Sequence, residues 1–195
     1  MFTSGIALAG LAAMMPGALA ASAGPTAPGC DGPDSRVYPP TGAVVIDASG
    51  AYTGSHKTIS AGVATLKNQT AEQTVFILPG TYHEQVLVSP LQGPLVFQGY
   101  TCDSSSYAAN EVTITSGLAQ KDIPPEVEGE ARNDLTSTLR LKSDNLRVYN
   151  LNIANTAGDV GQALAVNVNA TNTGFYGVNF TGEETHLNLQ LQNEY

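Results

Sequence analysis

A repeat of 27 residues in the second half of the chain constrains the fold more than any other feature of the sequence. Residues 146–155 align with residues 173–182, so that a tyrosine, an asparagine and several apolar residues coincide, and residues 137–145 align with 164–172 at the same spacing. A repeat of this length, made of two or three short strands, is typical of one coil of a parallel β-solenoid. Each coil then buries its apolar side chains against the next.

The first half of the chain predicts further short strands and one helix. Apolar residues at Ile59, Val63 and Leu66 give a helical stripe over residues 58–67, with Thr58 or Ser55 available as the N-cap. The predicted strands are short, rich in β-branched or aromatic residues and separated by Gly, Pro, Asn or Ser; they cover residues 44–46, 74–78, 85–88, 95–98 and 112–115. We expect the helix to cap the N-terminal end of the stack.

An antiparallel sandwich is the competing architecture. Sandwich strands are commonly joined by two-residue turns such as Asn-Gly or Asp-Gly, and none joins the strands predicted here. The repeat therefore favours an all-β parallel solenoid.

The N-terminus is typical of a secreted protein. The chain is almost wholly small and apolar from Gly5 to Ala23, and Ala18-Leu19-Ala20 fits the small-x-small rule for signal-peptide cleavage. We expect residues 1–20 to be a signal peptide, residues 21–42 an extended lead-in, and residues 43–195 the solenoid domain. The alternative of a membrane helix is disfavoured by the short apolar run and by Pro16, so we expect an extracellular protein without a membrane span.

Secretion bears on the cysteines and on the glycosylation sequons. Cys30 and Cys102 form an even pair in an oxidising compartment; they either form a disulfide or remain separate thiols, and their spacing alone does not decide. Of the three Asn-x-Thr sequons, Asn68 is the best candidate for a glycan, because Asn169 and Asn179 fall within predicted strands.

The net charge of −9 excludes nucleic acid as a natural partner, because phosphates require Lys and Arg. A polyanionic glycan would be repelled at neutral pH, whereas an esterified one would not. No group of His, Asp or Cys has metal-ligand spacing, so we expect no metal.

Several motifs together resemble the fungal type of pectin methylesterase. Gly80-Thr81-Tyr82-His83-Glu84 is similar to the Gly-x-Tyr-x-Glu motif of that family, and residues 155–158 to its Asn-Thr-Ala-Gly turn. Residues 162–166 are similar to its Gln-Ala-Val-Ala-Leu strand, and residues 175–182 to the stretch that follows. The motifs occur in the family's order, and the similarity runs from about Val44 to Gly182.

The resemblance implies a right-handed parallel β-helix that removes methyl groups from the esters of pectin, with no metal or organic cofactor. In the family, one Asp attacks the ester, a second Asp serves as general acid and base, two glutamines stabilise the oxyanion, and an Arg orients the nucleophile. Gln162 matches the first glutamine, which implies an oxyanion or substrate contact. Thr138 matches a substrate-contacting threonine, while Gly80, Tyr82 and Glu84 are expected to shape the turn below the cleft.

The similarity ends where the second glutamine is expected. Glu184 stands in its place, and an ionised carboxylate only accepts hydrogen bonds, so it cannot stabilise an oxyanion. No Asp, Lys or Arg follows Asp159 in the 195 residues. The resemblance is therefore to an incomplete β-helix with half an active site, and we expect these 195 residues alone to be inactive.

Two classes of function stay open. The first is a pectinesterase acting in cell-wall modification and pectin catabolism, and the second is a non-catalytic solenoid that binds polygalacturonan or has no function. A polygalacturonase or lyase on the same fold is disfavoured by the order of the motifs. We also expect self-association through the C-terminal coil, whose apolar residues would lack a neighbour.

Overall fold

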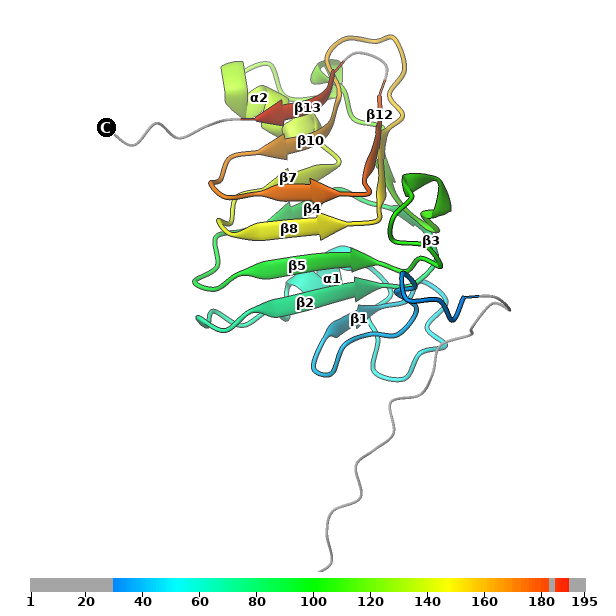
Figure 1. Ribbon diagram of the computed structural model, residues 1–195. Helices are drawn as coiled ribbons and strands as arrows, with labels where there is room; N and C mark the ends of the chain where they lie inside the picture. The colour runs from blue at the N-terminus through cyan, green and yellow to red at the C-terminus, as the bar shows by residue number, and fades with distance from the viewer. Residues whose placement is uncertain (1–29, 183–184, 190–195) are drawn as a thin grey trace, which may run out of the picture.

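The computed structural model describes residues 30–182 and 185–189, with side chains up to residue 182, and folds them as a parallel β-helix (Figure 1). The chain visits three parallel sheets in turn, so that each coil from β2 onward contributes one strand to each sheet, while the first coil contributes only β1. Sheet 1 contains β1 (Val44–Ile46), β2 (Gln73–Ile77), β5 (Leu95–Gly99), β8 (Leu146–Tyr149) and β11 (Gly174–Tyr176). Sheet 2 contains β3 (Gly80–His83), β6 (Val112–Ser116), β9 (Asn152–Asn155) and β12 (Asn179–Thr181). Sheet 3 contains β4 (Val86–Val88), β7 (Leu139–Leu141), β10 (Leu164–Val168) and β13 (Thr185–Leu189).

The 27-residue repeat is confirmed by the strand register. Arg147 pairs with Gly174 in sheet 1, Asn152 with Asn179 in sheet 2, and Leu139 with Val166 in sheet 3. All three pairs lie one repeat apart, so consecutive coils stack directly on one another. The solenoid is correct and the sandwich is excluded.

The corners between strands follow the same repeat. Asn145 and Asn172, which precede β8 and β11, have φ angles of 56° and 52°, and the Asn172 amide donates a 2.6 Å hydrogen bond to the Asn145 oxygen. Asn150 and Gly177 follow the same strands with φ angles of 51° and 59°. Asn and Gly tolerate this left-handed conformation better than other residues, so the repeated Asn and Gly positions set the corners of the coil.

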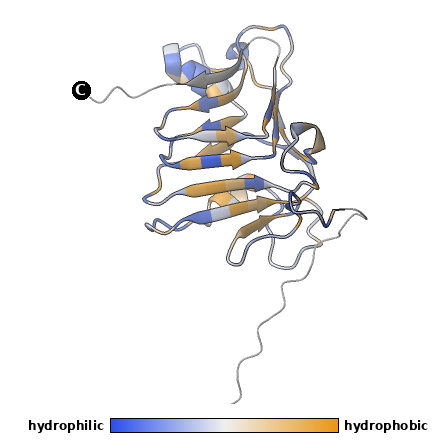
Figure 2. Ribbon diagram, viewed as in Figure 1, coloured by the Kyte–Doolittle hydropathy of each residue, from blue (hydrophilic) through white to orange (hydrophobic). Residues whose placement is uncertain are grey.

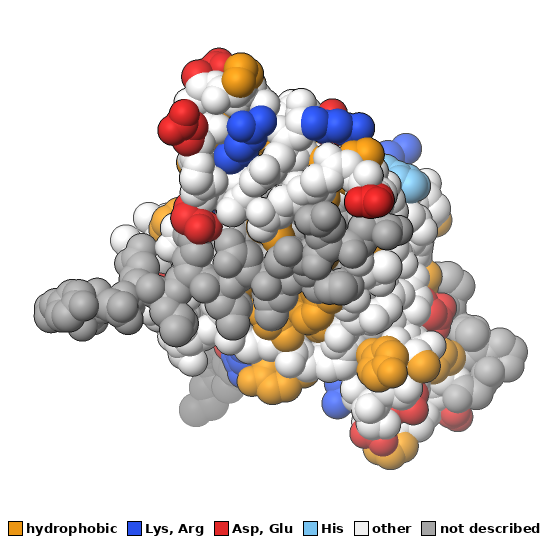
Figure 3. Space-filling model, turned by 90° about the horizontal axis from the view of Figure 1, so that it is seen from above, with side chains coloured by type: hydrophobic (Ala, Val, Ile, Leu, Met, Phe, Trp, Pro, Cys, Tyr) orange, Lys and Arg blue, Asp and Glu red, His pale blue; other side chains and the backbone are white. Residues whose placement is uncertain are grey.

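Side chains of successive coils stack in columns inside the helix. In sheet 1, the register places Val75, Phe97, Val148 and Phe175 one above the other, and the first three are completely buried. Hydrophobic segments accordingly mark the strands of the stack (Figure 2). Seen along the stack from above, charged side chains stand at the periphery, and apolar side chains are visible nearer the middle (Figure 3).

The N-terminal capping helix is confirmed, but it is shorter than predicted. Helix α1 (Ile59–Val63) packs a fully buried Ile59 against the first coil, and the Thr58 side chain caps it by accepting a 3.1 Å hydrogen bond from the Ala61 amide. After Val63 the chain continues in single turns, in which the Thr65 amide donates to the Gly62 carbonyl and the Leu66 amide to the Val63 carbonyl.

The sequence did not predict the second helix, α2 (Gly129–Thr136), nor strand β3. Helix α2 has no apolar stripe and is held to the β-helix by polar contacts, so hydrophobic periodicity could not reveal it. Two short 3-10 turns, Tyr107–Ala109 and Gln120–Asp122, complete the described elements.

Residues 30–42, in the expected lead-in, are attached to the β-helix. Cys30 and Val37 are buried with the core, and Arg36 forms an antiparallel bridge with Thr101. The predicted signal peptide, residues 1–20, lies outside the described residues. Of the C-terminal apolar residues that underlie the predicted self-association, Phe175, Val178 and Phe180 pack partly buried against the core, whereas the side chains after residue 182 lie outside the described part of the chain. No helix in the part of the chain that the structure describes is long and apolar enough to cross a membrane.

The closest packing between coils occurs at Gly99, at the end of β5, and it generates a stability prediction. A Cβ atom on Gly99 would collide with the carbonyl oxygen of Asn150, and it would also lie 2.7 Å from Leu151. We expect Gly99→Ala to lower the free energy of unfolding by about 1–3 kcal/mol, because a backbone atom has to move. The melting temperature measured by circular dichroism should fall by roughly 2–4 °C per kcal/mol.

Gly32→Ala is the matched control, because its Cβ would meet nothing within 4 Å. Equal melting temperatures for the two variants would contradict the close approach at Gly99.

Candidate functional site

The candidate site is built around Gln162, which lies in the loop between β9 and β10, two residues before β10 begins. Gly158 and Gly161 have φ angles of 77° and 99°, and they allow this loop to arch out of the stack. Val160 stands at the tip with 37% of its surface exposed. Gln162 itself is half-buried, and its side chain forms no hydrogen bond within residues 30–182.

Asn155, at the end of β9, holds both ends of the loop. Its side-chain amide donates to the carbonyl oxygens of Leu118 (2.9 Å), Thr136 (2.9 Å) and Leu164 (3.1 Å), while its oxygen accepts from the Ala157 amide (3.0 Å). Asn155 is 2% exposed. One buried side chain thus joins three segments of the chain around the position of Gln162.

A second set of contacts fixes Gln162 from the side of α2. The Gln120 amide donates a 3.0 Å hydrogen bond to the Gln162 carbonyl. The Gln120 carbonyl in turn accepts from the Arg132 guanidinium at 2.8 Å and 3.2 Å, and the Gln120 side chain donates to Asn133 at 2.6 Å. Helix α2 is therefore connected to the backbone of Gln162 through one intermediate residue.

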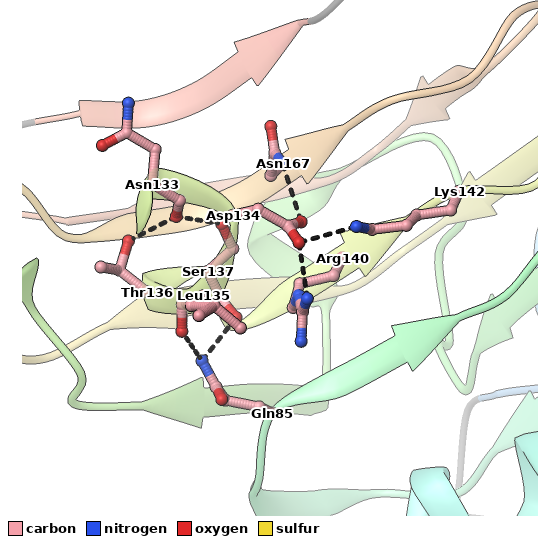
Figure 4. A network of polar contacts seen from close by, with 9 residues as sticks. All are labelled: Gln85, Asn133, Asp134, Leu135, Thr136, Ser137, Arg140, Lys142 and Asn167. Atoms are coloured by element: carbon pink, nitrogen blue, oxygen red, sulfur yellow. Dashed lines mark hydrogen bonds and ion pairs between the residues drawn. The ribbon is translucent and has the colours of Figure 1, made fainter. Parts of the chain in front are cut away.

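Asp134 anchors α2 to sheet 3 (Figure 4). Its carboxylate, only 6% exposed, accepts from Arg140 of β7 at 2.5 Å, from Lys142 at 2.8 Å and from Asn167 of β10 at 2.9 Å. Burial acts to raise the pKa of the Asp134 carboxyl, but these three hydrogen bonds outweigh it and lower the pKa to about 2. Gln85 adds a further link, donating to the Leu135 and Ser137 carbonyls (Figure 4).

Thr138, which the family resemblance implies as a substrate contact, lies inside the coil. Its side chain is completely buried, and its hydroxyl donates to the Ala154 carbonyl at 2.8 Å and lies 2.8 Å from the Ser116 hydroxyl. The residue lies on the inward side of the coil, where it links β9 to the segment before β7.

The Gly80, Tyr82 and Glu84 motif lies below the site and holds the cap helix in place. Gly80 has a φ of 152°, which favours glycine. The Tyr82 hydroxyl donates to the Leu78 carbonyl at 2.9 Å, and burial raises the pKa of Tyr82 to about 12. Glu84 accepts hydrogen bonds from the Ile59 and Ser60 amides at the start of α1, at 2.7 Å and 2.9 Å. A carboxylate at a helix N-terminus satisfies otherwise unpaired donors.

The remaining candidate residues lie away from the site. Cys30 and Cys102 form a disulfide with Cα atoms 4.7 Å apart, which joins residues 30–36 to the end of β5. Asn68 is exposed on the surface after α1, and its oxygen accepts from the Gln92 amide. Glu184 lies outside the described residues. Across residues 30–182, no cluster of three or more His, Cys, Asp and Glu residues could hold a metal ion.

The chain is similar to fungal pectinesterases along most of its length. It is 42% identical to a pectinesterase from Aspergillus aculeatus over 162 residues, covering 82% of this chain and 46% of the relative. It is 41% identical to a pectinesterase from Aspergillus niger over 155 residues, covering 78% of this chain and 44% of the relative. No family model matches. The chain spans about half the length of the curated relatives that it matches.

The fold is similar to that of a solved pectin methylesterase. The crystal structure of the pectin methylesterase from Aspergillus niger in deglycosylated form superposes with a TM-score of 0.68 at 32% identity, covering 79% of this chain and 48% of that one.

The Asp134 contacts generate a pH prediction. The folded-state pKa of Asp134, about 2, lies below the ordinary value of an aspartate, so the ionised carboxylate stabilises the fold above about pH 4, and this contribution is lost as the pH falls towards 2. We expect Asp134→Asn to lower the free energy of unfolding by about 2 kcal/mol at pH 7, with little difference from wild type at pH 2. Thermal unfolding measured from pH 2 to pH 7 gives the comparison.

Asp31→Asn, at an exposed carboxylate, provides the control for the loss of one negative charge. A destabilisation by Asp134→Asn that is constant across this pH range would show that the carboxylate charge does not hold α2.

Proposed function

Because the chain belongs to the pectinesterase family, we propose that it functions in the hydrolysis of pectin methyl esters, to which it contributes the half of the site that includes Gln162. The observation that carries the proposal is the 42% identity to a fungal pectinesterase over 162 residues, together with a matching β-helix in which the Gln162 side chain is available. Pectin is accordingly the proposed partner.

The geometry around Gln162 suits an oxyanion contact. An amide that donates to developing negative charge is effective only when its position is fixed before the reaction. Asn155 fixes the two ends of the Gln162 loop, and the Gln120 amide fixes the Gln162 carbonyl. These contacts fix the backbone from which the Gln162 side chain extends. Val160, exposed at the loop tip, would lie on the same side as the substrate.

The carboxylates of the family's mechanism have no match in these 195 residues, so the activity is tested in a chimera. Residues 44–182 would replace the matched part of the Aspergillus aculeatus pectinesterase, which would supply the rest of the β-helix. We expect the chimera to release methanol from highly esterified pectin, and Gln162→Ala to lower kcat by about 10²–10³-fold, as does the loss of one oxyanion donor. The 195-residue chain alone should release no methanol.

Val160→Ala in the same chimera is the control for changes to the loop. A folded chimera that binds pectin without releasing methanol would favour the competing hypothesis of a non-catalytic solenoid. Full activity of Gln162→Ala would remove Gln162 from the site.

We also propose that the protein is secreted and carries a glycan on Asn68. Asn68 is exposed and lies outside the sheets, as an N-glycan requires, whereas Asn179 is within β12. Expression in a eukaryotic host should give a mass excess that is removed by an endoglycosidase and abolished by Asn68→Gln. Asn179→Gln should leave this excess unchanged, and an unaltered mass in Asn68→Gln would contradict the assignment.

A further inference from the structure

The outer face of sheet 1 carries a hollow that the candidate site does not use. The hollow has a volume of about 310 Å³ and runs beside the starts of four successive strands of the sheet. Its lining combines one aromatic ring with amides, a hydroxyl and an ion pair, from Glu72, Pro94, Asn145, Arg147, Asn172, Thr173, Gly174 and Tyr176. Gln162 belongs to the opposite part of the coil, at the start of sheet 3.

The hollow exists because a side chain is missing from a column. The register stacks Thr74, Val96, Arg147 and Gly174 on the outer face of sheet 1. Gly174 has no Cβ, and the Tyr176 hydroxyl occupies the space that a Cβ would need, at 2.7 Å from its position. The Tyr176 ring therefore lies back along its own strand instead of pointing straight out.

A second column supports that ring. Tyr176 stacks on Tyr149, one repeat earlier, with ring centroids 4.7 Å apart and an interplanar angle of 16°. Tyr176 nevertheless remains 51% exposed. An offset stack holds a ring in one orientation, so the Tyr176 ring is fixed beside the hollow, with Tyr149 covering one of its faces.

The polar groups around the ring include both donors and acceptors. Arg147 forms an ion pair with Glu72, and both side chains remain nearly half exposed, at 44% and 47%. The Asn172 amide donates to Asn145, which leaves the Asn172 oxygen and the Asn145 amide facing other partners. The Thr173 hydroxyl is buried without a hydrogen-bond partner among the described residues, and a buried hydroxyl without a partner is unfavourable.

We propose that this hollow is a second carbohydrate-binding site, which takes an uncharged pyranose of a polysaccharide. A flat aromatic surface with paired donors and acceptors suits a sugar ring and its hydroxyl groups. A carboxylate is disfavoured because Glu72 neutralises Arg147 and the chain carries a net charge of −9. The uncharged sugar is either a methyl-esterified galacturonate or a neutral galactose, which share this chemistry.

Affinity electrophoresis of the whole chain in native gels tests the proposal. The gels contain highly methyl-esterified polygalacturonan, neutral galactan or fully de-esterified polygalacturonate. We expect retardation by one or both uncharged polymers, and the pattern identifies the source of the sugar. Tyr176→Ala and Gly174→Ala should weaken binding roughly tenfold or more, as expected for the loss of one well-packed contact.

Gly174→Ala tests the position of the Tyr176 ring with the least effect on the backbone. The φ of Gly174 is not in the left-handed region, and only the end of the Tyr176 side chain has to move. Its melting temperature should match wild type. Tyr107→Ala removes an equally exposed tyrosine elsewhere, 62% exposed, and should bind as wild type does.

The choice of the methyl-esterified probe rests on the proposed function, whereas the galactan probe does not. Gln162→Ala should leave retardation by either uncharged polymer unchanged, so failure at one site is distinguishable from failure at the other. The proposal would be overturned if both Tyr176→Ala and Gly174→Ala bound as wild type does. It would also be overturned if only the de-esterified polymer retarded the protein, or if no uncharged polymer did.

Discussion

The direct stacking of one coil on the next is the constraint on which the rest of this structure depends. A coil of three short strands cannot bury its apolar side chains alone, and it gains that burial only when each strand pairs in register with its neighbour. The left-handed corners at Asn145 and Asn172 keep successive coils superimposable. A change at one corner would displace the inward side chains of every coil above it, so the polar corner residues determine how the apolar side chains of successive coils align.

Elements outside the stack are attached by a few buried polar groups. Glu84 caps α1, Asp134 fixes α2 against sheet 3, and Asn155 joins the loop of Gln162 to two other segments. Each of these side chains satisfies several donors or acceptors at once. Because hydrogen bonds are directional, they fix position more closely than apolar packing does, and this suits a site whose chemistry requires a fixed amide. The β-helix supplies stability, and these contacts supply position.

The sequence predicted the stack well and the site only in part. The repeat and the Asn positions are visible because identical coils must carry similar residues. Helix α2 was not predicted, because it packs through Asp134 and Arg132 and leaves no apolar pattern. The burial of Thr138 was not predicted, because a motif match does not show the direction of a side chain; its hydroxyl bonds the Ala154 carbonyl inside the coil. The role of Glu84 depends on contact with residues 24 and 25 positions earlier, which no local pattern reveals.

The unequal lengths of the coils have a consequence for the order in which the chain folds. The pairs β7–β10, β8–β11 and β9–β12 connect residues one 27-residue repeat apart, whereas β4 and β7 pair across roughly twice that separation, with α2 in the intervening segment. Doubling a loop adds only about 0.6 kcal/mol to the entropy of closure, but folding rates fall as contacts become less local. The regular coils are therefore the natural nucleus, and the coil that carries α2 would close later, bringing the walls around Gln162 together only after its neighbours have formed.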